Sequence, residues 1–200
     1  TGTTGAWTST SRTLGTTVAA VNDAPTATPT TLAATTEDLA SPLGSTVSAL
    51  GFGYSDITDN QSAGGSAIPG GGDTSTPFGG IAIVANAANS TTQGVWQYST
   101  DSGSTWTSIG DGSAGLGAAP TTATAILLPT TAKLRFLPNV LDFNGTPGSL
   151  SIKVSDANVV FSSSTDISAA NATTGQWSAT NTLSTSVTAV NDAPLISGLD

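Results

Sequence analysis

The sequence lacks cysteine, histidine and methionine altogether. Without cysteine no disulfide framework can form, and without histidine or cysteine the usual zinc sites, thiol nucleophiles and histidine-dependent triads are excluded. Only 8% of the 200 residues are charged, and thirteen acidic residues against four basic ones give a net charge of −9. Such a surface repels phosphate, which argues against nucleic-acid binding. No apolar run is long enough to span a membrane.

Threonine and serine, which together make up roughly a third of the chain, take the place of the missing charges. Thr/Val-rich alternating runs are typical of strands, and no segment keeps a helical period of 3.6 over ten residues. Residues 94–110 predict a hairpin that turns at Asp101-Ser102-Gly103. Residues 133–140 and 149–157 also alternate, so that Leu134, Phe136, Leu150, Ile152 and Val154 face one way. The pattern predicts an all-β sandwich.

Five aromatic residues are expected to supply the large side chains of the core: Trp96, Trp106, Phe136, Phe143 and Phe161. A long glycine-rich loop is expected over residues 61–80, where strand and helix signals are both missing. A structureless stretch of this length is unusual in a compact domain. It is either a functional surface loop or a tolerated insertion.

The phrase AVNDAP occurs twice, at residues 20–25 and 189–194. Residues 5–25 align with residues 175–194, and Trp7 then falls on Trp177. This repeat predicts that residues 1–21 are the last strand of a preceding repeat, followed by a linker at 22–25. Residues 26–190 would form one β-sandwich repeat, and residues 191–200 the next linker and the start of another repeat. Both tryptophans are interpreted as packing residues at the end of a module.

Several of these segments together resemble a known family. LRFLPNVLDFNGTPGSLSIKVSDAN at residues 134–158, followed by VNDAP, resembles the cadherin-like tandem repeats of very large bacterial surface adhesins. TTEDLAS at residues 35–41 and the hairpin at residues 94–110 are similar to other segments of that family. The resemblance implies an immunoglobulin- or cadherin-like β-sandwich, an extracellular, secreted or cell-surface location, and calcium bound at the joints between repeats.

The resemblance also implies two sets of calcium ligands. At the upstream joint, Asn22 and Asp23 would meet Asp156 and either Asp56 or Asp59. At the downstream joint, Asn191 and Asp192 would meet Glu37. The chemistry is suitable, because calcium takes six to eight oxygen ligands and a linker alone cannot supply them all. Ordinary turn chemistry is the alternative for Asp23 and Asp192.

Three further acidic residues are given other roles. Asp38 is interpreted as a solvated loop residue, which is also the alternative for Asp56 and Asp59, and Asp101 and Asp111 are interpreted as turn residues.

The sequence therefore predicts a non-enzymatic extension module of an adhesin, stiffened by calcium and joined to neighbouring repeats of its own chain. Two alternatives stay open. The glycine-rich loop and exposed aromatic residues would suit a module that binds glycans or a partner protein. Residues 1–21 would suit strand pairing with another copy of the chain, as in a self-assembling extracellular matrix or filament.

Overall fold

The computed structural model describes residues 14–15, 22–57, 76–170 and 175–193. These residues form a mostly β structure with several sheets and almost no helix, as the sequence predicts. The helices of the described part are α1 (Val47–Leu50) and the short 3-10 helix η2 (Thr122–Thr124). Most of the glycine-rich stretch, and residues 1–21 except Leu14 and Gly15, lie outside the described residues.

A six-stranded sheet is the larger of the sheets. In sheet order its strands are β1 (Thr30–Thr31), β11 (Asn181–Ser184), β9 (Leu150–Ser155), β4 (Gly80–Asn86), β7 (Ala125–Pro129) and β10 (Ser162–Thr165). All neighbouring pairs are antiparallel except β1 and β11, which run parallel. The closing segment, residues 175–193, therefore completes a sheet whose other strands come from earlier in the chain.

A four-stranded antiparallel sheet contains β3 (Ser45–Thr46), β8 (Lys133–Leu137), β5 (Val95–Ser99) and β6 (Thr107–Ser108), in that order. The predicted hairpin is present between β5 and β6, and Ser102 and Gly103 at its turn have φ angles of 63° and 96°. A third pairing joins β12 (Val187–Thr188) to β2 (Thr35–Thr36) in parallel.

The two larger sheets share one hydrophobic core. The five residues predicted to face one way, Leu134, Phe136, Leu150, Ile152 and Val154, are all buried in it. They pack with β4, whose Ile81 and Ile83 are fully buried. A second, smaller core lies against the opposite side chains of β4 and includes Trp177. The interpretation of Trp177 as a packing residue is therefore confirmed, while Trp7 lies outside the described residues.

The aromatic residues expected in the core divide into three groups. Trp96 and Phe136 are buried and meet edge-on, with ring centroids 5.4 Å apart. Trp106 and Phe143 are only half-buried. The prediction for Phe161 was wrong, because this ring is exposed and lies against Tyr98 outside the core.

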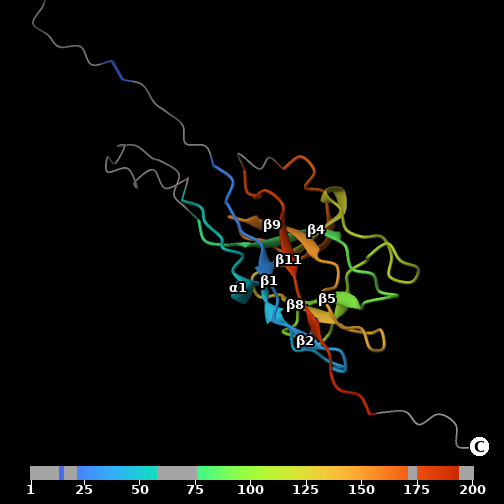
Figure 1. Ribbon diagram of the computed structural model, residues 1–200. Coiled ribbons are helices and arrows are strands. Elements are labelled where there is room, and N and C mark those ends of the chain that lie inside the picture. Colours follow the sequence, from blue (N-terminus) through green and yellow to red (C-terminus); the bar gives the residue numbers. More distant parts are fainter. Residues whose placement is uncertain (1–13, 16–21, 58–75, 171–174, 194–200) are drawn as a thin grey trace, which may run out of the picture.

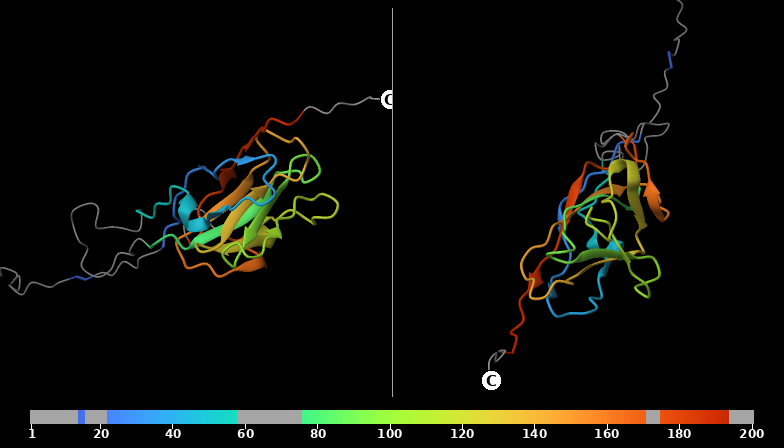
Figure 2. Two further views of the ribbon diagram at one scale, coloured as in Figure 1. Left: turned by 90° about the horizontal axis from the view of Figure 1, so that it is seen from below. Right: turned by 90° about the vertical axis from the view of Figure 1, so that its right-hand side faces the viewer.

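The described chain enters the domain at one end and leaves it at the other (Figure 1). A second direction of view shows the same arrangement, with the closing segment running down the length of the body to the exit (Figure 2). We call the end around Asn22, Asp23, Asp56 and Asp156 the entry pole. The end around Glu37, Asp38, Asp142 and residues 190–192 is the exit pole.

Candidate functional site

The entry pole brings together residues far apart in the sequence. The side-chain amide of Asn22 donates to Oδ2 of Asp156 at 2.9 Å, across 134 positions. The backbone carbonyl of Asn22 accepts a hydrogen bond from the backbone N–H of Gly175 at 3.0 Å. Asn22 is therefore fixed to the domain that follows it by both its side chain and its backbone.

Thr76 connects Asp56, another of the expected ligands, to Asp156. Its backbone N–H donates to Oδ2 of Asp56 at 2.6 Å, and its hydroxyl donates to the backbone carbonyl of Asp156 at 2.6 Å. Tyr54 in turn donates its hydroxyl proton to the carbonyl of Thr76 at 2.7 Å. Three of the predicted upstream residues, Asn22, Asp56 and Asp156, thus lie in one connected network.

The carboxylates of this network are withdrawn from solvent. Asp56 and Asp156 are each only 4% exposed. Oδ1 of Asp56 is buried and has no hydrogen-bond partner among the residues that the structure describes. A buried carboxylate oxygen without a donor is costly unless a cation or another donor meets it. Asp23 is half-buried beside this network, and Asp59 lies outside the described residues.

The exit pole is organised by Glu37. One carboxylate oxygen, Oε1, accepts the backbone N–H of Val190 at 2.7 Å, and the other accepts the side-chain amide of Asn144 at 3.1 Å. The backbone N–H of Glu37 donates to the carbonyl of Thr188 at 3.2 Å. Glu37 therefore binds the exit strand immediately before the second Asn-Asp pair.

Four acidic side chains gather around this point. The pKa of Asp38 is raised by desolvation and by the negative charges of Asp192, Glu37 and Asp142. Asp38 is exposed, as expected of a solvated loop residue, and it lies near the other three carboxylates. Asp142 was missed, and the signal that would have found it is its place beside the Asn-Gly turn at residues 144–145. Its backbone carbonyl accepts a hydrogen bond from the amide of Asn144.

The two copies of the Asn-Asp pair share one local contact. The amide of Asn22 reaches the carbonyl of Asp23 at 3.4 Å, and the amide of Asn191 reaches the carbonyl of Asp192 at the same distance. Asn191 and Asp192 are otherwise exposed. The two described Asn-Asp pairs therefore make the same local contact, but the first is also anchored to the domain and the second is exposed.

Within the described ranges, no group of three or more acidic side chains is close enough together to hold a metal ion. Each pole by itself offers two kinds of oxygen donor, carboxylate and amide, but not a full calcium shell. A complete shell at either pole would need donors from a second domain.

Comparison of the chain with protein-family models, curated proteins and solved structures finds no match. The geometry of the two poles therefore carries the functional proposal. No helix of the described residues has the length and apolar character needed to cross a membrane.

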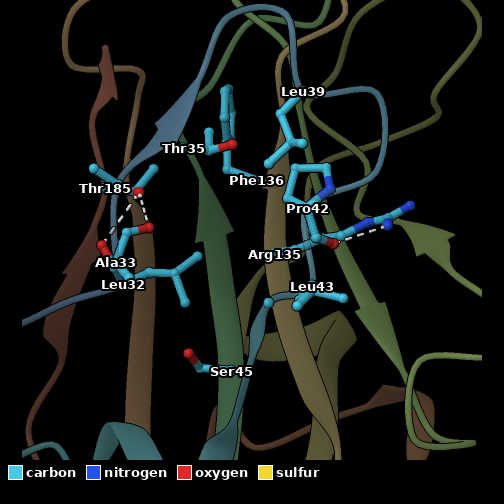
Figure 3. Close-up of a pocket in the computed structure, with 12 residues that line it drawn as sticks. Leu32, Ala33, Thr35, Leu39, Pro42, Leu43, Ser45, Arg135, Phe136 and Thr185 are labelled. Atoms are coloured by element: carbon cyan, nitrogen blue, oxygen red, sulfur yellow. Dashed lines mark hydrogen bonds between the residues drawn. The ribbon is translucent and has the colours of Figure 1, made fainter.

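A separate hollow of about 260 Å³ opens between the β1–β2 segment and the β3–β8 pair (Figure 3). Its walls are mostly apolar and include Leu32, Leu39, Pro42, Leu43 and Phe136. The buried hydroxyl of Thr35 has no hydrogen-bond partner among the described residues. A mostly apolar hollow of this kind suits an apolar side chain or a small ligand.

Arg135 borders this hollow, but its guanidinium turns away from it, beyond Pro42 (Figure 3). It donates to Oε1 of Gln97 at 2.8 Å and to the carbonyl of Pro42 at 3.1 Å. It also lies over the ring of Trp106, 4.0 Å from the centroid. Desolvation lowers the pKa of Arg135. This arginine and Trp106 thus fasten the 40–44 loop and the hairpin to the sheet.

Asp101 and Asp111 are turn residues, as predicted. Asp101 accepts hydrogen bonds from the hydroxyl and the backbone N–H of Thr105, which lower its pKa to about 2. Asp111 accepts from the backbone N–H groups of Ser90 and Ser113 at 2.7 and 2.8 Å. Both carboxylates serve the local fold, so neither belongs to a candidate site.

Proposed function

We propose that this chain contributes an extension module to a secreted or cell-surface adhesin, in which neighbouring modules share calcium at their joints. The proposal includes an immunoglobulin- or cadherin-like arrangement of the two sheets. Support for that arrangement comes from the core that the six-stranded and four-stranded sheets share. The entry and exit of the chain at opposite ends suit a module that adds length (Figure 1).

The observation that carries the proposal is the anchoring of the connector. Val190 is bound to Glu37 of its own module, whereas Asn22 is bound to Asp156 of the module that follows it. Because the phrase is repeated, Asn191 is the counterpart of Asn22 and would bind the Asp156 of a following module. Val190 and Asn191 are consecutive, with Cα atoms 3.8 Å apart. Two neighbouring residues of one connector would then be bound by carboxylates of two different modules, Glu37 of one and Asp156 of the next.

Such an arrangement supplies what calcium requires. Glu37 and Asp192 of one module and Asp56 and Asp156 of the next offer carboxylate oxygens, and Asn191 offers an amide oxygen. The buried Oδ1 of Asp56, which no described residue meets, supports the fit. A divalent cation would relieve the repulsion between these charges, and its loss would weaken the alignment of the modules.

The test uses a tandem chain of residues 1–194 followed by residues 26–200, which keeps the natural joint. Small-angle scattering is recorded in calcium and in chelator, and we expect a longer maximum dimension in calcium. At ten to a hundred times a dissociation constant of about 10⁻⁴–10⁻³ M, bound calcium stabilises the joint by about 1.4–2.7 kcal/mol. Glu37→Gln in the first copy should remove most of this effect.

Asp166→Asn is the matched control, because Asp166 is an exposed carboxylate whose hydrogen-bond partner is the nearby Ser168. It removes the same charge without touching either pole. Identical scattering profiles in calcium and chelator would refute calcium bridging. An equal loss of calcium response in both variants would show that net charge matters, and not the joint.

A binding role is the second candidate, and the hollow near Thr35 favours it. Its walls are mostly apolar, so the hollow suits an apolar side chain of a protein partner better than a glycan. Tryptophan fluorescence distinguishes a glycan-binding module from an extension module. A response to polysaccharides without a response to calcium would favour a glycan-binding module over the extension module.

A further inference from the structure

Exposed apolar side chains collect at the exit pole, among the acidic ones. Leu39, Leu141 and Val190 are large hydrophobic residues with substantial exposure, and Leu141 reaches 87%. Leu39 and Leu141 line a hollow of about 350 Å³, together with Val140 and Pro138, and Glu37, Asp38 and Asp142 lie at the same hollow. Apolar side chains and the carboxylates of Glu37, Asp38 and Asp142, which we call the acidic rim, therefore line one hollow at the exit pole.

The position of Leu141 is fixed by the turn that carries it. Asp142 has a φ of 57°, a conformation that non-glycine residues adopt rarely, and Phe143 donates its backbone N–H to the carbonyl of Val140 at 3.3 Å. Gly145 then pairs with Val187 through two backbone hydrogen bonds of 2.9 and 2.8 Å. The turn is thus attached to the exit strand, and Leu141 is held at its exposed tip.

Among the described residues of the entry pole, Ile57 is an exposed apolar side chain close to the connector. Ile57 is 64% exposed and follows the buried Asp56 directly. Two residues earlier, Ser55 pairs with Thr26 through backbone hydrogen bonds of 2.7 and 3.0 Å. Thr26 follows the first AVNDAP phrase without a gap, so Ile57 is tied to the first residues after the connector.

We infer that Ile57 of a following module packs against Leu141 and Leu39 of the preceding one. The inference rests on the proposed tandem arrangement and adds a contact that does not depend on calcium. Val190 is bound to Glu37 of its own module, and Asn191, as the counterpart of Asn22, would be bound to the next module. Anchors at consecutive positions would leave the two poles little freedom to separate. Burying one leucine or isoleucine side chain gains free energy even where no ion is bound. In chelator the apolar contact therefore opposes the repulsion of the acidic rim.

The absence of cysteine from the chain makes a direct test clean. In the same tandem chain, Leu141→Cys in the first copy is combined with Ile57→Cys in the second, and oxidation is followed in chelator. A disulfide requires Cα atoms within about 7 Å, so it reports close approach of the two positions. We expect intramolecular crosslinking about tenfold faster than in a control that combines Leu43→Cys with the same Ile57→Cys.

Leu43 is the matched control because it is also a highly exposed leucine but lines the other hollow. Equal crosslinking rates for the two pairs would overturn the inference, as would no crosslinking of the Leu141 pair. The calcium arm keeps the two proposals apart. Lengthening in calcium without crosslinking in chelator would leave calcium bridging standing and remove the apolar contact. Crosslinking in chelator without lengthening in calcium would support the apolar contact and remove calcium bridging.

A second measurement tests energy as well as proximity. Leu141→Ser should broaden the distribution of tandem shapes in chelator, while Leu43→Ser should leave it unchanged. Scattering that is the same for both serine variants and the parent would show that Leu141 does not hold the joint, even if the two cysteines meet.

Discussion

Leu14 and Leu183 are the same residue type at equivalent positions of the repeated segment, but the exposed fractions of their side chains lie at opposite extremes. Leu183 is 0% exposed and packs in the main core, whereas Leu14 is 98% exposed. Leu183→Ala should therefore cost about 2–5 kcal/mol of unfolding free energy. Leu14→Ala should cost less than about 0.5 kcal/mol, because the side chain is already in solvent.

The informative experiment places residues 5–21, which include Leu14, directly after a module that lacks its own closing segment. A longer chain is made in which residues 22–174 precede residues 5–200, so the leading module has no closing segment other than residues 5–21. If those residues are the last strand of a module of this kind, Leu14 takes the place of Leu183 in the leading core. Leu14→Ala should then cost about 2–5 kcal/mol there. For a module of this size that is a fall in melting temperature of about 4–20 °C.

Urea unfolding followed by tryptophan fluorescence measures the free energies, and hydrogen exchange assigns the loss to the leading or the trailing module. Leu183→Ala in the trailing copy is the reference, with its loss confined to that copy. A cost for Leu14→Ala that stays below about 0.5 kcal/mol in the longer chain would refute the reasoning. Residues 5–21 would then not close a module, despite their similarity to residues 175–190.

Three smaller predictions concern two buried polar residues, Thr35 and Lys153, and the half-buried Asp111. Thr35→Val removes a buried hydroxyl without a described partner, so the free energy of unfolding in urea should stay the same or rise by up to about 1 kcal/mol. Desolvation lowers the pKa of Lys153 in the folded protein below its ordinary 10.5. Between this lowered pKa and 10.5, the unfolded chain therefore binds more protons than the folded one. The parent should therefore gain stability as the pH rises through this window, and Lys153→Met, compared by urea denaturation at each pH, should not. For Asp111, desolvation acts to raise the pKa, but hydrogen bonds from Ser90 and Ser113 outweigh it and lower the pKa from 3.8 to about 2. That stabilisation is complete above 3.8 and lost as the pH falls through about 2, so acid unfolding of Asp111→Asn should show a smaller loss in this range.

Alternation along the sequence found some strands and missed others for one physical reason. Strands β8 and β9 alternate, and their inward residues could be named in advance. Strands β4 and β7 read as continuous apolar runs, GIAIVAN and AILLP, because both of their faces meet other parts of the protein. Such runs carry no period of two and are easily taken for core segments of any kind.

The site could be predicted only in part. The pairing of Asn22 with Asp156, 134 positions away, was implied by a family resemblance and not by any local pattern. Asp142 was missed because the Asn-Gly turn beside it was interpreted only as a backbone reversal, and not as a turn that places a carboxylate. Its electrostatic effect on Asp38 depends on a spatial approach that the sequence does not encode locally. The role of these residues as calcium ligands stays a prediction.

The anchoring of the connector decides how stiff a string of such modules would be. A flexible linker of several residues would let the modules swing whether or not an ion were bound. Val190 is held by Glu37, and Asn22, the counterpart of Asn191, is held by Asp156. In the proposed tandem arrangement the free length between modules would therefore approach that of one peptide unit. With so short a pivot, acidic rims that face each other either repel strongly or share a cation. Calcium would then control the angle of a joint that is already short, and the inferred contact of the exposed Leu141 would limit how far the joint opens when the ion is removed.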